Sequence, residues 1–232
     1  MNNISIIPIN NLPEFEPKHD LADEIVKSFS SNNFVLEDKD IIVITQKIVS
    51  KVEDRLIKND NESIEKLIQQ ESLEILRKRG DTVIARTKHG FICANAGIDK
   101  SNIEKGSFLL LPEDPDKTSR DIRKKIEHVT NKKISIIISD TFGRAWRKGQ
   151  TNVAIGSSGI QPLESYIGEK DAFDNELFAT EIAIIDELAG AAELVMKKSD
   201  NIPVAIIRGV NYKYSDLGVK ELIRKEDEDF FL

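Results

Sequence analysis

Three short runs of β-branched apolar residues constrain the fold of this chain more than any other feature of its sequence. Ile41–Ile44, Ile134–Ile138 and Val204–Ile207 consist almost entirely of isoleucine, valine and alanine. Continuous runs of this length and composition are typical of strands that are covered on both faces. The sequence therefore predicts a sheet whose strands lie in the core, between layers of helices.

The segments between these runs carry helical patterns and shorter strand patterns. Leu21, Ile25 and Phe29 recur with helical spacing after Asp20, which can cap a helix N-terminus. Three further helices are predicted: from Ile64 to Gly80, around Ile122 and Ile126 with Thr118 or Ser119 as cap, and from Glu176 to Met196. Shorter strands are predicted over 4–9, 82–86, 90–94 and 108–111.

The order of these elements indicates an α+β fold, with a mixed sheet and flanking helices. Strands and helices alternate without the strict rhythm of a doubly wound sheet. A length of 232 residues fits one large domain or two small ones, because domains average roughly 150 residues. No linker-like segment divides the chain. We therefore predict one domain over 1–232, with a sub-lobe over about 149–190 as the alternative.

Charge and cysteine content exclude several classes of protein. The formal net charge of −7 argues against a nucleic-acid-binding protein or one held electrostatically on anionic lipid, since both need a basic surface. Cys93 is the only cysteine, so neither an intrachain disulfide nor a Cys-rich zinc site is possible. The sequence has no secretory signal pattern and no uninterrupted apolar stretch of about 18 residues. We expect a soluble, cytoplasmic protein without membrane contact.

Two acidic positions are candidates for metal chemistry. Asp99 follows a segment of small residues, where the backbone can approach a ligand closely. Asp140 and Thr141 follow an apolar run and are predicted at the C-terminal end of its strand. Carboxylate and hydroxyl oxygens suit hard cations such as Mg²⁺ or Mn²⁺, which share their ligands with phosphate. The alternative is that Asp99 stabilises a turn and Asp140 caps a helix.

Basic residues near these acids are candidates for binding anions. Arg144, Arg147 and Lys148 lie between two glycines directly after Asp140, and could hold carboxylate or phosphate groups. Lys47 and Lys51 follow the first core strand and share a face if that stretch is helical. Both clusters could also be ordinary solvated surface charge. Acidic groups for metal beside basic groups for phosphate are what phosphoryl transfer requires.

The sequence lacks the common nucleotide-binding motifs. The sequence contains neither a P-loop nor the glycine fingerprint of a dinucleotide-binding fold. Neither Cys93 nor Ser139 stands in a sequence pattern typical of a catalytic triad, which neither supports nor excludes one.

Four segments in order resemble the coenzyme F420:L-glutamate ligases, also described as F420-0:γ-glutamyl ligases. They are Thr45–Lys51, His89–Asp99, Leu111–Asp116 and Ser139–Arg144, and the likeness runs along essentially the whole chain. The resemblance implies a family-specific α+β fold and a stand-alone ligase in coenzyme F420 biosynthesis. It implies that GTP is consumed to GDP and phosphate while L-glutamate is joined to F420-0, with further γ-linked additions.

The resemblance also implies cofactors, partners and site residues. It implies one or two Mg²⁺ or Mn²⁺ ions, K⁺ as a monovalent cation, and a homodimer. Asp99 and Asp140 look like ligands of one divalent ion, and Thr141 looks like a ligand of a second. The residues that look like GTP contacts are Pro13, Glu14, Phe15, Glu16, Gln46, Lys47, Lys51 and Asn102. Arg144, Arg147 and Lys148 are assigned to substrate carboxylates from their charge and position alone.

One segment departs from the pattern of some relatives. An acidic, glycine-rich run that contributes to nucleotide and second-metal binding is replaced here by Met196–Pro203, which contains two lysines. A protonated lysine cannot coordinate a cation, so the second metal has different ligands here, or Asp200 supplies one with altered register. Two alternative functions stay open: a γ-glutamyl ligase for another acidic acceptor, such as a folate-like compound, and a nucleotide- and metal-binding module without turnover.

Overall fold

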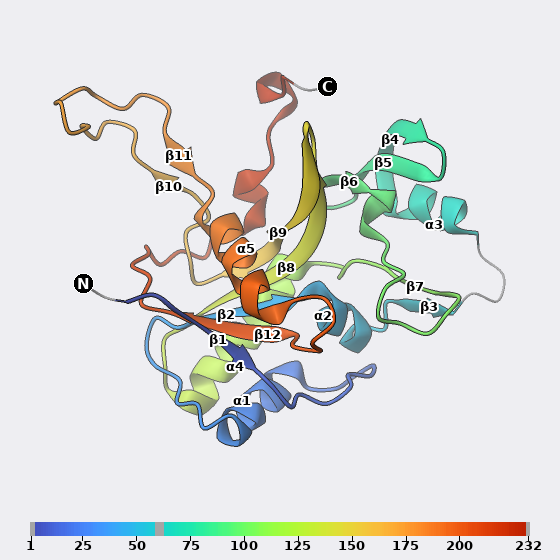
Figure 1. Cartoon of the computed structure of the whole chain (residues 1–232), viewed down its shortest axis with the longest axis horizontal. Coiled ribbons are helices and arrows are strands. Elements are labelled where there is room, and N and C mark those ends of the chain that lie inside the picture. The colour runs from blue at the N-terminus through green and yellow to red at the C-terminus, as the bar shows by residue number, and fades with distance from the viewer. Residues whose placement is uncertain (1–2, 59–62, 231–232) are drawn as a thin grey trace.

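A mixed five-stranded sheet forms the centre of the protein (Figure 1). The computed structural model describes residues 3–58 and 63–230, so the ends of the domain expected over 1–232 lie outside the described residues. The strand order is β1-β12-β2-β8-β9. Only β2 and β8 pair in parallel, and the other neighbours are antiparallel. The bounds are β1 Ser5–Ile9, β2 Ile41–Thr45, β8 Ser135–Arg144, β9 Arg147–Ser158 and β12 Val204–Arg208.

The three predicted core strands lie beside one another in this sheet. Ile44 of β2 is opposite Val204 of β12 on one side and Ile138 of β8 on the other. All three side chains are fully buried. The prediction of a mixed sheet with buried strands is therefore confirmed.

Helices cover both faces of the sheet. Figure 1 shows α5 on one side and α1 with α4 on the other. As predicted, Asp20 caps α1, where its carboxylate accepts a hydrogen bond from the Asp23 N–H. Asp114 caps α4, so Thr118 and Ser119 were wrongly predicted as caps; their hydroxyls donate instead to Glu53 and to the Asp116 carbonyl. The helix bounds are α1 Leu21–Ser31, α2 Gln46–Val52, α4 Pro115–Thr130 and α5 Ile184–Met196.

A smaller unit with its own apolar core stands beside the main sheet. Leu67, Val83 and Phe108 are among its buried residues. Its elements are β3 Leu56–Lys58, α3 Ile64–Glu71, β4 Ser72–Arg79, β5 Thr82–Thr87, β6 Ile92–Ala94, the 3₁₀ turn η1 Asn95–Gly97 and β7 Ser107–Leu109. The segment 149–190, proposed as a sub-lobe, is divided: β9 joins the main sheet, and β10 Glu164–Ser165 with β11 Glu181–Ile182 forms the base of a projecting arm (Figure 1).

Two predicted helices were too long. The helix from Ile64 ends at Glu71, and residues 72–79 form β4, which pairs with β5 through a turn containing Gly80 in the left-handed conformation. The spacing of the apolar residues fitted a helix, but the backbone N–H and C=O groups of residues 72–79 form their hydrogen bonds with β5 instead. The helix expected from Glu176 begins at Ile184. The residues before it form backbone hydrogen bonds within the arm instead; for example, the Gly168 N–H donates to the Leu177 carbonyl.

Short 3₁₀ turns, η2 Val219–Leu222 and η3 Glu226–Glu228, lie in the C-terminal segment. Within the described part of the chain, no helix combines the length and apolar character needed to cross a bilayer.

Candidate functional site

A cleft of about 150 Å³ opens where distant parts of the sequence meet. The loop before α1, helix α2 with the end of β2, and the end of α5 with the segment after it form its walls, and Asn102 and Asn152 also line it. The Thr45 N–H donates to the Pro203 carbonyl, which holds the segment after α5 against the start of α2. Six of the eight residues predicted to contact GTP line this cleft: Pro13, Glu14, Phe15, Lys47, Lys51 and Asn102.

The other two predicted GTP contacts lie elsewhere. Gln46 is fully buried, its side-chain oxygen accepts a hydrogen bond from the Ser50 hydroxyl, and its amide nitrogen has no partner among the described residues. Glu16 is exposed, and its backbone N–H donates to His19. Lys47 and Lys51 lie on one short helix, which is the condition under which they were expected to share a face, and Lys51 forms an ion pair with Glu14 at 3.1 Å.

Asp99 reaches the cleft from the smaller unit through Lys47. Its backbone pairs with Leu109, which fixes its position at the edge of that unit. One carboxylate oxygen forms a close ion pair with the Lys47 ammonium. The other accepts hydrogen bonds from the Ser101 N–H at 2.7 Å and from the Ser101 hydroxyl at 2.8 Å. The carboxylate is therefore held by charge and by an Asx-type turn.

Asp140 lies near the same lysine but comes from the main sheet. It stands within β8, not at its end as predicted, because β8 continues to Arg144 as one arm of a hairpin with β9. Burial raises the pKa of Asp140 to about 6, while the Thr141 N–H and the charges of Lys47 and Lys198 act in the opposite direction. Burial also lowers the pKa of Lys47, and the Asp140 charge partly offsets this. The two acids predicted from separate segments thus both act on Lys47.

Thr141 lies in a hydrogen-bonded group that the sequence did not predict. Its hydroxyl donates to the Asn152 side-chain oxygen at 2.6 Å and accepts a hydrogen bond from the Lys198 ammonium at 2.5 Å. The Asn152 amide nitrogen donates to Glu193 at 2.9 Å. Thr141 and Asn152 are opposite residues on β8 and β9. Only the departure at Met196–Pro203 pointed to Lys198, and no sequence signal pointed to Asn152 or Glu193.

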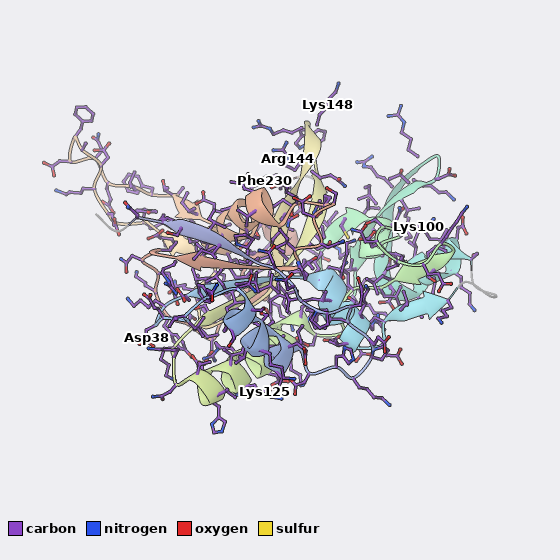
Figure 2. All side chains as sticks on the ribbon, turned by 60° about the horizontal axis from the view of Figure 1, so that its bottom comes forward. Asp38, Lys100, Lys125, Arg144, Lys148 and Phe230 are labelled. Carbon is purple, nitrogen blue, oxygen red and sulfur yellow. The ribbon has the colours of Figure 1, made fainter. Side chains whose placement is uncertain are left out.

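Arg144, Arg147 and Lys148 lie at the tip of the β8–β9 hairpin. All three are exposed, and none lines the cleft. Figure 2 labels Arg144 and Lys148 at the projecting end of this hairpin. The Arg144 guanidinium donates to the Lys148 carbonyl at 2.7 Å, which closes the turn. Their assignment to substrate carboxylates stays a prediction.

The remaining candidate nucleophiles do not suit covalent catalysis. Burial raises the pKa of the Cys93 thiol to about 12, so the thiol stays protonated near neutral pH. The Ser139 hydroxyl is buried and has no hydrogen-bond partner in the described chain.

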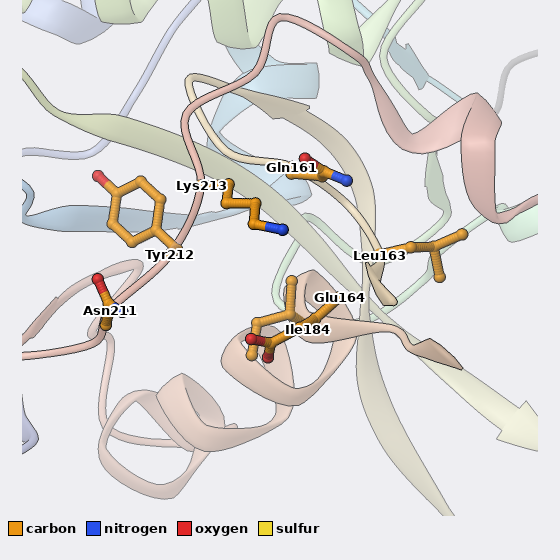
Figure 3. Close-up of a pocket in the computed structure, with 7 residues that line it drawn as sticks. All are labelled: Gln161, Leu163, Glu164, Ile184, Asn211, Tyr212 and Lys213. Carbon is orange, nitrogen blue, oxygen red and sulfur yellow. The ribbon is translucent and has the colours of Figure 1, made fainter. Parts of the chain in front are cut away.

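A smaller hollow, of about 20 Å³, lies near the base of the arm and is lined by residues such as Gln161, Tyr212 and Lys213 (Figure 3). Its size suits about one water molecule.

The side chains that could coordinate a metal ion are few. Within 3–58 and 63–230, no three His, Cys, Asp or Glu side chains cluster in a way that could hold a metal ion. Asp99 and Asp140 offer carboxylate oxygens, the donors that a divalent ion prefers, but an ion would have to displace the Lys47 ammonium to bind the paired oxygen of Asp99. The position at Thr141 fits a second ion less well, because its hydroxyl is neutral and already bonds to the Lys198 ammonium. Asp200 pairs with Lys197 at 3.4 Å and is not a lining residue.

The fold and the cleft define an α+β protein with a lysine-lined site suited to an anionic ligand. The profile of the family described as F420-0:Gamma-glutamyl ligase matches residues 10–209. The chain is 44% identical over 218 residues to the coenzyme F420:L-glutamate ligase of Methanococcus maripaludis strain C7, covering 86% of this chain and 88% of that protein. It is also 44% identical over 216 residues to the protein of that name from Methanocaldococcus jannaschii, covering 85% and 86%. The chain belongs to the F420-0:gamma-glutamyl ligase family.

Proposed function

We propose that this protein is a coenzyme F420:L-glutamate ligase that uses GTP and binds its triphosphate in the cleft beside Lys47. The main support is that Asp99, from the smaller unit, and Asp140, from the main sheet, both act on Lys47 at the edge of this cleft. Family membership and relatives whose name specifies F420 and L-glutamate support the substrates.

The reaction must activate a carboxylate, because an amine does not displace an oxide from it at a useful rate. A carboxylate oxygen of F420-0 attacks the γ-phosphorus of GTP, and the bond to the β-phosphate oxygen breaks to release GDP. The amine of L-glutamate then attacks the acyl carbon, the amide C–N bond forms, and phosphate leaves with the activated oxygen. The amine nitrogen loses a proton in this step, and the departing phosphate or solvent takes it up. Repetition on the γ-carboxylate of the added glutamate gives the successive additions that we propose.

The lysines of the cleft bind and orient the nucleotide in this proposal. Lys47 and Lys51 place positive charge beside the phosphates, and Asn102 offers an amide for a polar contact. Asp99 and Asp140 would hold one Mg²⁺ or Mn²⁺ ion. That ion supplies charge neutralisation at the transferring phosphoryl group. Arg144, Arg147 and Lys148 would bind substrate carboxylates from the hairpin tip, and we propose K⁺ and a homodimer from the family resemblance.

Substitution of Asp140 tests the proposal. With Asp140→Asn we expect GDP release that depends on both F420-0 and L-glutamate to fall by more than about 100-fold, since even indirect partners of metal ligands change activity by about 10–100-fold. The matched control is Asp38→Asn, because Asp38 is exposed and lies outside the cleft lining. Circular dichroism checks that both variants are folded. Near-normal turnover in Asp140→Asn would contradict the assigned role, and wild-type protein that binds GTP without glutamate-dependent phosphate release would contradict a ligase.

A further inference from the structure

The ammonium group of Lys198 contacts oxygen atoms of three neighbouring side chains. It donates to the Thr141 hydroxyl at 2.5 Å and to the Asn152 side-chain oxygen at 3.3 Å, and it pairs with a Glu193 carboxylate oxygen at 3.1 Å. A lysine ammonium offers three donors and no acceptor, and here it makes two hydrogen bonds and one ion pair. The three acceptors are oxygens, the type of ligand that a hard cation prefers.

The fold holds this ammonium in place from several directions. Lys197 follows α5 with a positive φ of 49° and turns the chain away from the helix axis before Lys198. The Asn102 amide donates to the Lys198 backbone carbonyl at 3.2 Å. Asn152 is almost fully buried and bridges Thr141 to Glu193. Lys198 is therefore part of a connected polar group, although its side chain is 57% exposed.

This group occupies the position where a second divalent ion would have to bind. The Thr141 hydroxyl donates its proton to Asn152 and accepts from Lys198, so a metal ion could use its oxygen only after displacing the ammonium. Lys198 is also close enough to influence the pKa values of Asp140 and Lys47. A divalent ion added here would meet the repulsion of two lysines as well as the loss of these hydrogen bonds.

We propose that the Lys198 ammonium is the built-in second cation of this cleft, so that the protein binds one divalent ion per nucleotide instead of two. The inference rests on the proposed function, because it assumes a nucleotide in the cleft. Lysine is a compact point charge, which is the property needed to replace an ion beside a phosphate group. Lys198 acts on the nucleotide through this fixed charge, which chelators cannot remove.

The number of bound ions tests the proposal without measuring turnover. Wild-type protein is dialysed to equilibrium with Mn²⁺ and the β,γ-imido analogue of GTP, which cannot transfer its γ-phosphoryl group. We expect one protein-bound Mn²⁺ per bound nucleotide in the wild type, and a ratio that rises toward two in Lys198→Gln. The matched control is Lys170→Gln, which removes an exposed lysine that pairs with Asp174 at 3.3 Å and lies outside the cleft lining, and which we expect to keep a ratio of one.

Electron paramagnetic resonance gives a second measurement, since two Mn²⁺ ions roughly 3.5–4 Å apart couple their spins and broaden the signal. We expect the coupled signal in Lys198→Gln alone. A ratio of two in the wild type would overturn the proposal by itself, whatever the variant does. A ratio of one in both proteins would also overturn it, because Lys198 would not be what excludes the second ion. Wild-type protein that retains no nucleotide would instead contradict the proposed function.

Discussion

Asp40 is fully buried, and its charge is compensated by a single arginine. Arg208 donates from Nε to one carboxylate oxygen at 2.7 Å and from Nη2 to the other at 2.6 Å. The Glu37 N–H adds a third hydrogen bond to the carboxylate at 2.8 Å. This two-pronged contact joins the last residue of β12 to the start of β2, which are neighbours in the sheet. It also raises the pKa of Arg208 above its ordinary value.

Removal of the Asp40 carboxylate should destabilise the protein strongly. Asp40→Ala removes both hydrogen bonds from Arg208 and the one from the Glu37 N–H, while Arg208 keeps Glu37 and the Val35 carbonyl as partners, and we expect the free energy of unfolding to fall by about 1.5–3 kcal/mol. Glu37→Ala is the matched control, because Glu37 binds the same arginine at 2.6 Å but is 59% exposed, and exposed pairs contribute about 0–1 kcal/mol. Urea unfolding followed by circular dichroism measures both. Equal losses in the two variants would show that burial of Asp40 is not what makes the pair important.

Single residues also show how far sequence reasoning reached in the site. Asp99 and Asp140 could be identified because each carboxylate follows a recognisable local pattern. Asn152 and Glu193 could not, because their role depends on partners that only the folded chain brings together. Gln46 belonged to a matching segment, yet its side chain is buried behind the cleft. A sequence pattern identifies the segment and does not determine the direction of each side chain.

At the scale of elements, the contact between α4 and β9 depends on one residue without a side chain. A Cβ on Gly156 of β9 would lie 2.5 Å from the carbonyl carbon and oxygen of Pro115, the first residue of α4. Ser157 strengthens the same junction, because its N–H donates to the Asp116 carboxylate at 2.8 Å. The helix therefore lies against bare backbone, and there is no flexible side chain that could move aside.

Gly156→Ala should separate this helix from the sheet. Overpacking of this kind lowers the free energy of unfolding by about 1–3 kcal/mol, and the rigid backbone partner places this substitution at the upper end. Gly143→Ala is the control on the neighbouring strand β8, because a Cβ there has nothing within 4 Å, and we expect a change within about 0.5 kcal/mol. Thermal unfolding of both variants provides the comparison. A Gly156→Ala protein as stable as the wild type would mean that α4 can shift freely on β9.

Elements with continuous apolar runs were predicted well, and those with ambiguous spacing were not. β2, β8 and β12 read as strands because a buried strand needs no alternation. Residues 72–79 fitted a helix equally well, and only pairing with β5 decides between the two. Leu73 and Ile75 are exposed, so burial did not select their conformation. The spacing of apolar residues within one segment cannot show whether its backbone pairs with the next strand.

At the scale of the whole molecule, the cleft is formed by segments that lie far apart in the sequence. The loop before α1, helix α2, Asn102 from the smaller unit and the segment after α5 each supply part of its wall. The sequence predicted most of these contributors one by one. It did not predict that the β8–β9 hairpin would carry Arg144, Arg147 and Lys148 away to an exposed tip.

Hydrogen exchange can test this assembly in one experiment. With Mn²⁺ and the β,γ-imido GTP analogue, we expect slower amide exchange in residues 12–15, 47–52 and 198–203, because bound ligand stabilises every segment that contacts it. Residues 144–148 at the hairpin tip should exchange as in the free protein, which makes them the internal control. If F420-0 is then added, protection at the tip would support its role in binding substrate carboxylates. Nucleotide-dependent protection confined to the tip would place the triphosphate there and remove the cleft from the reaction.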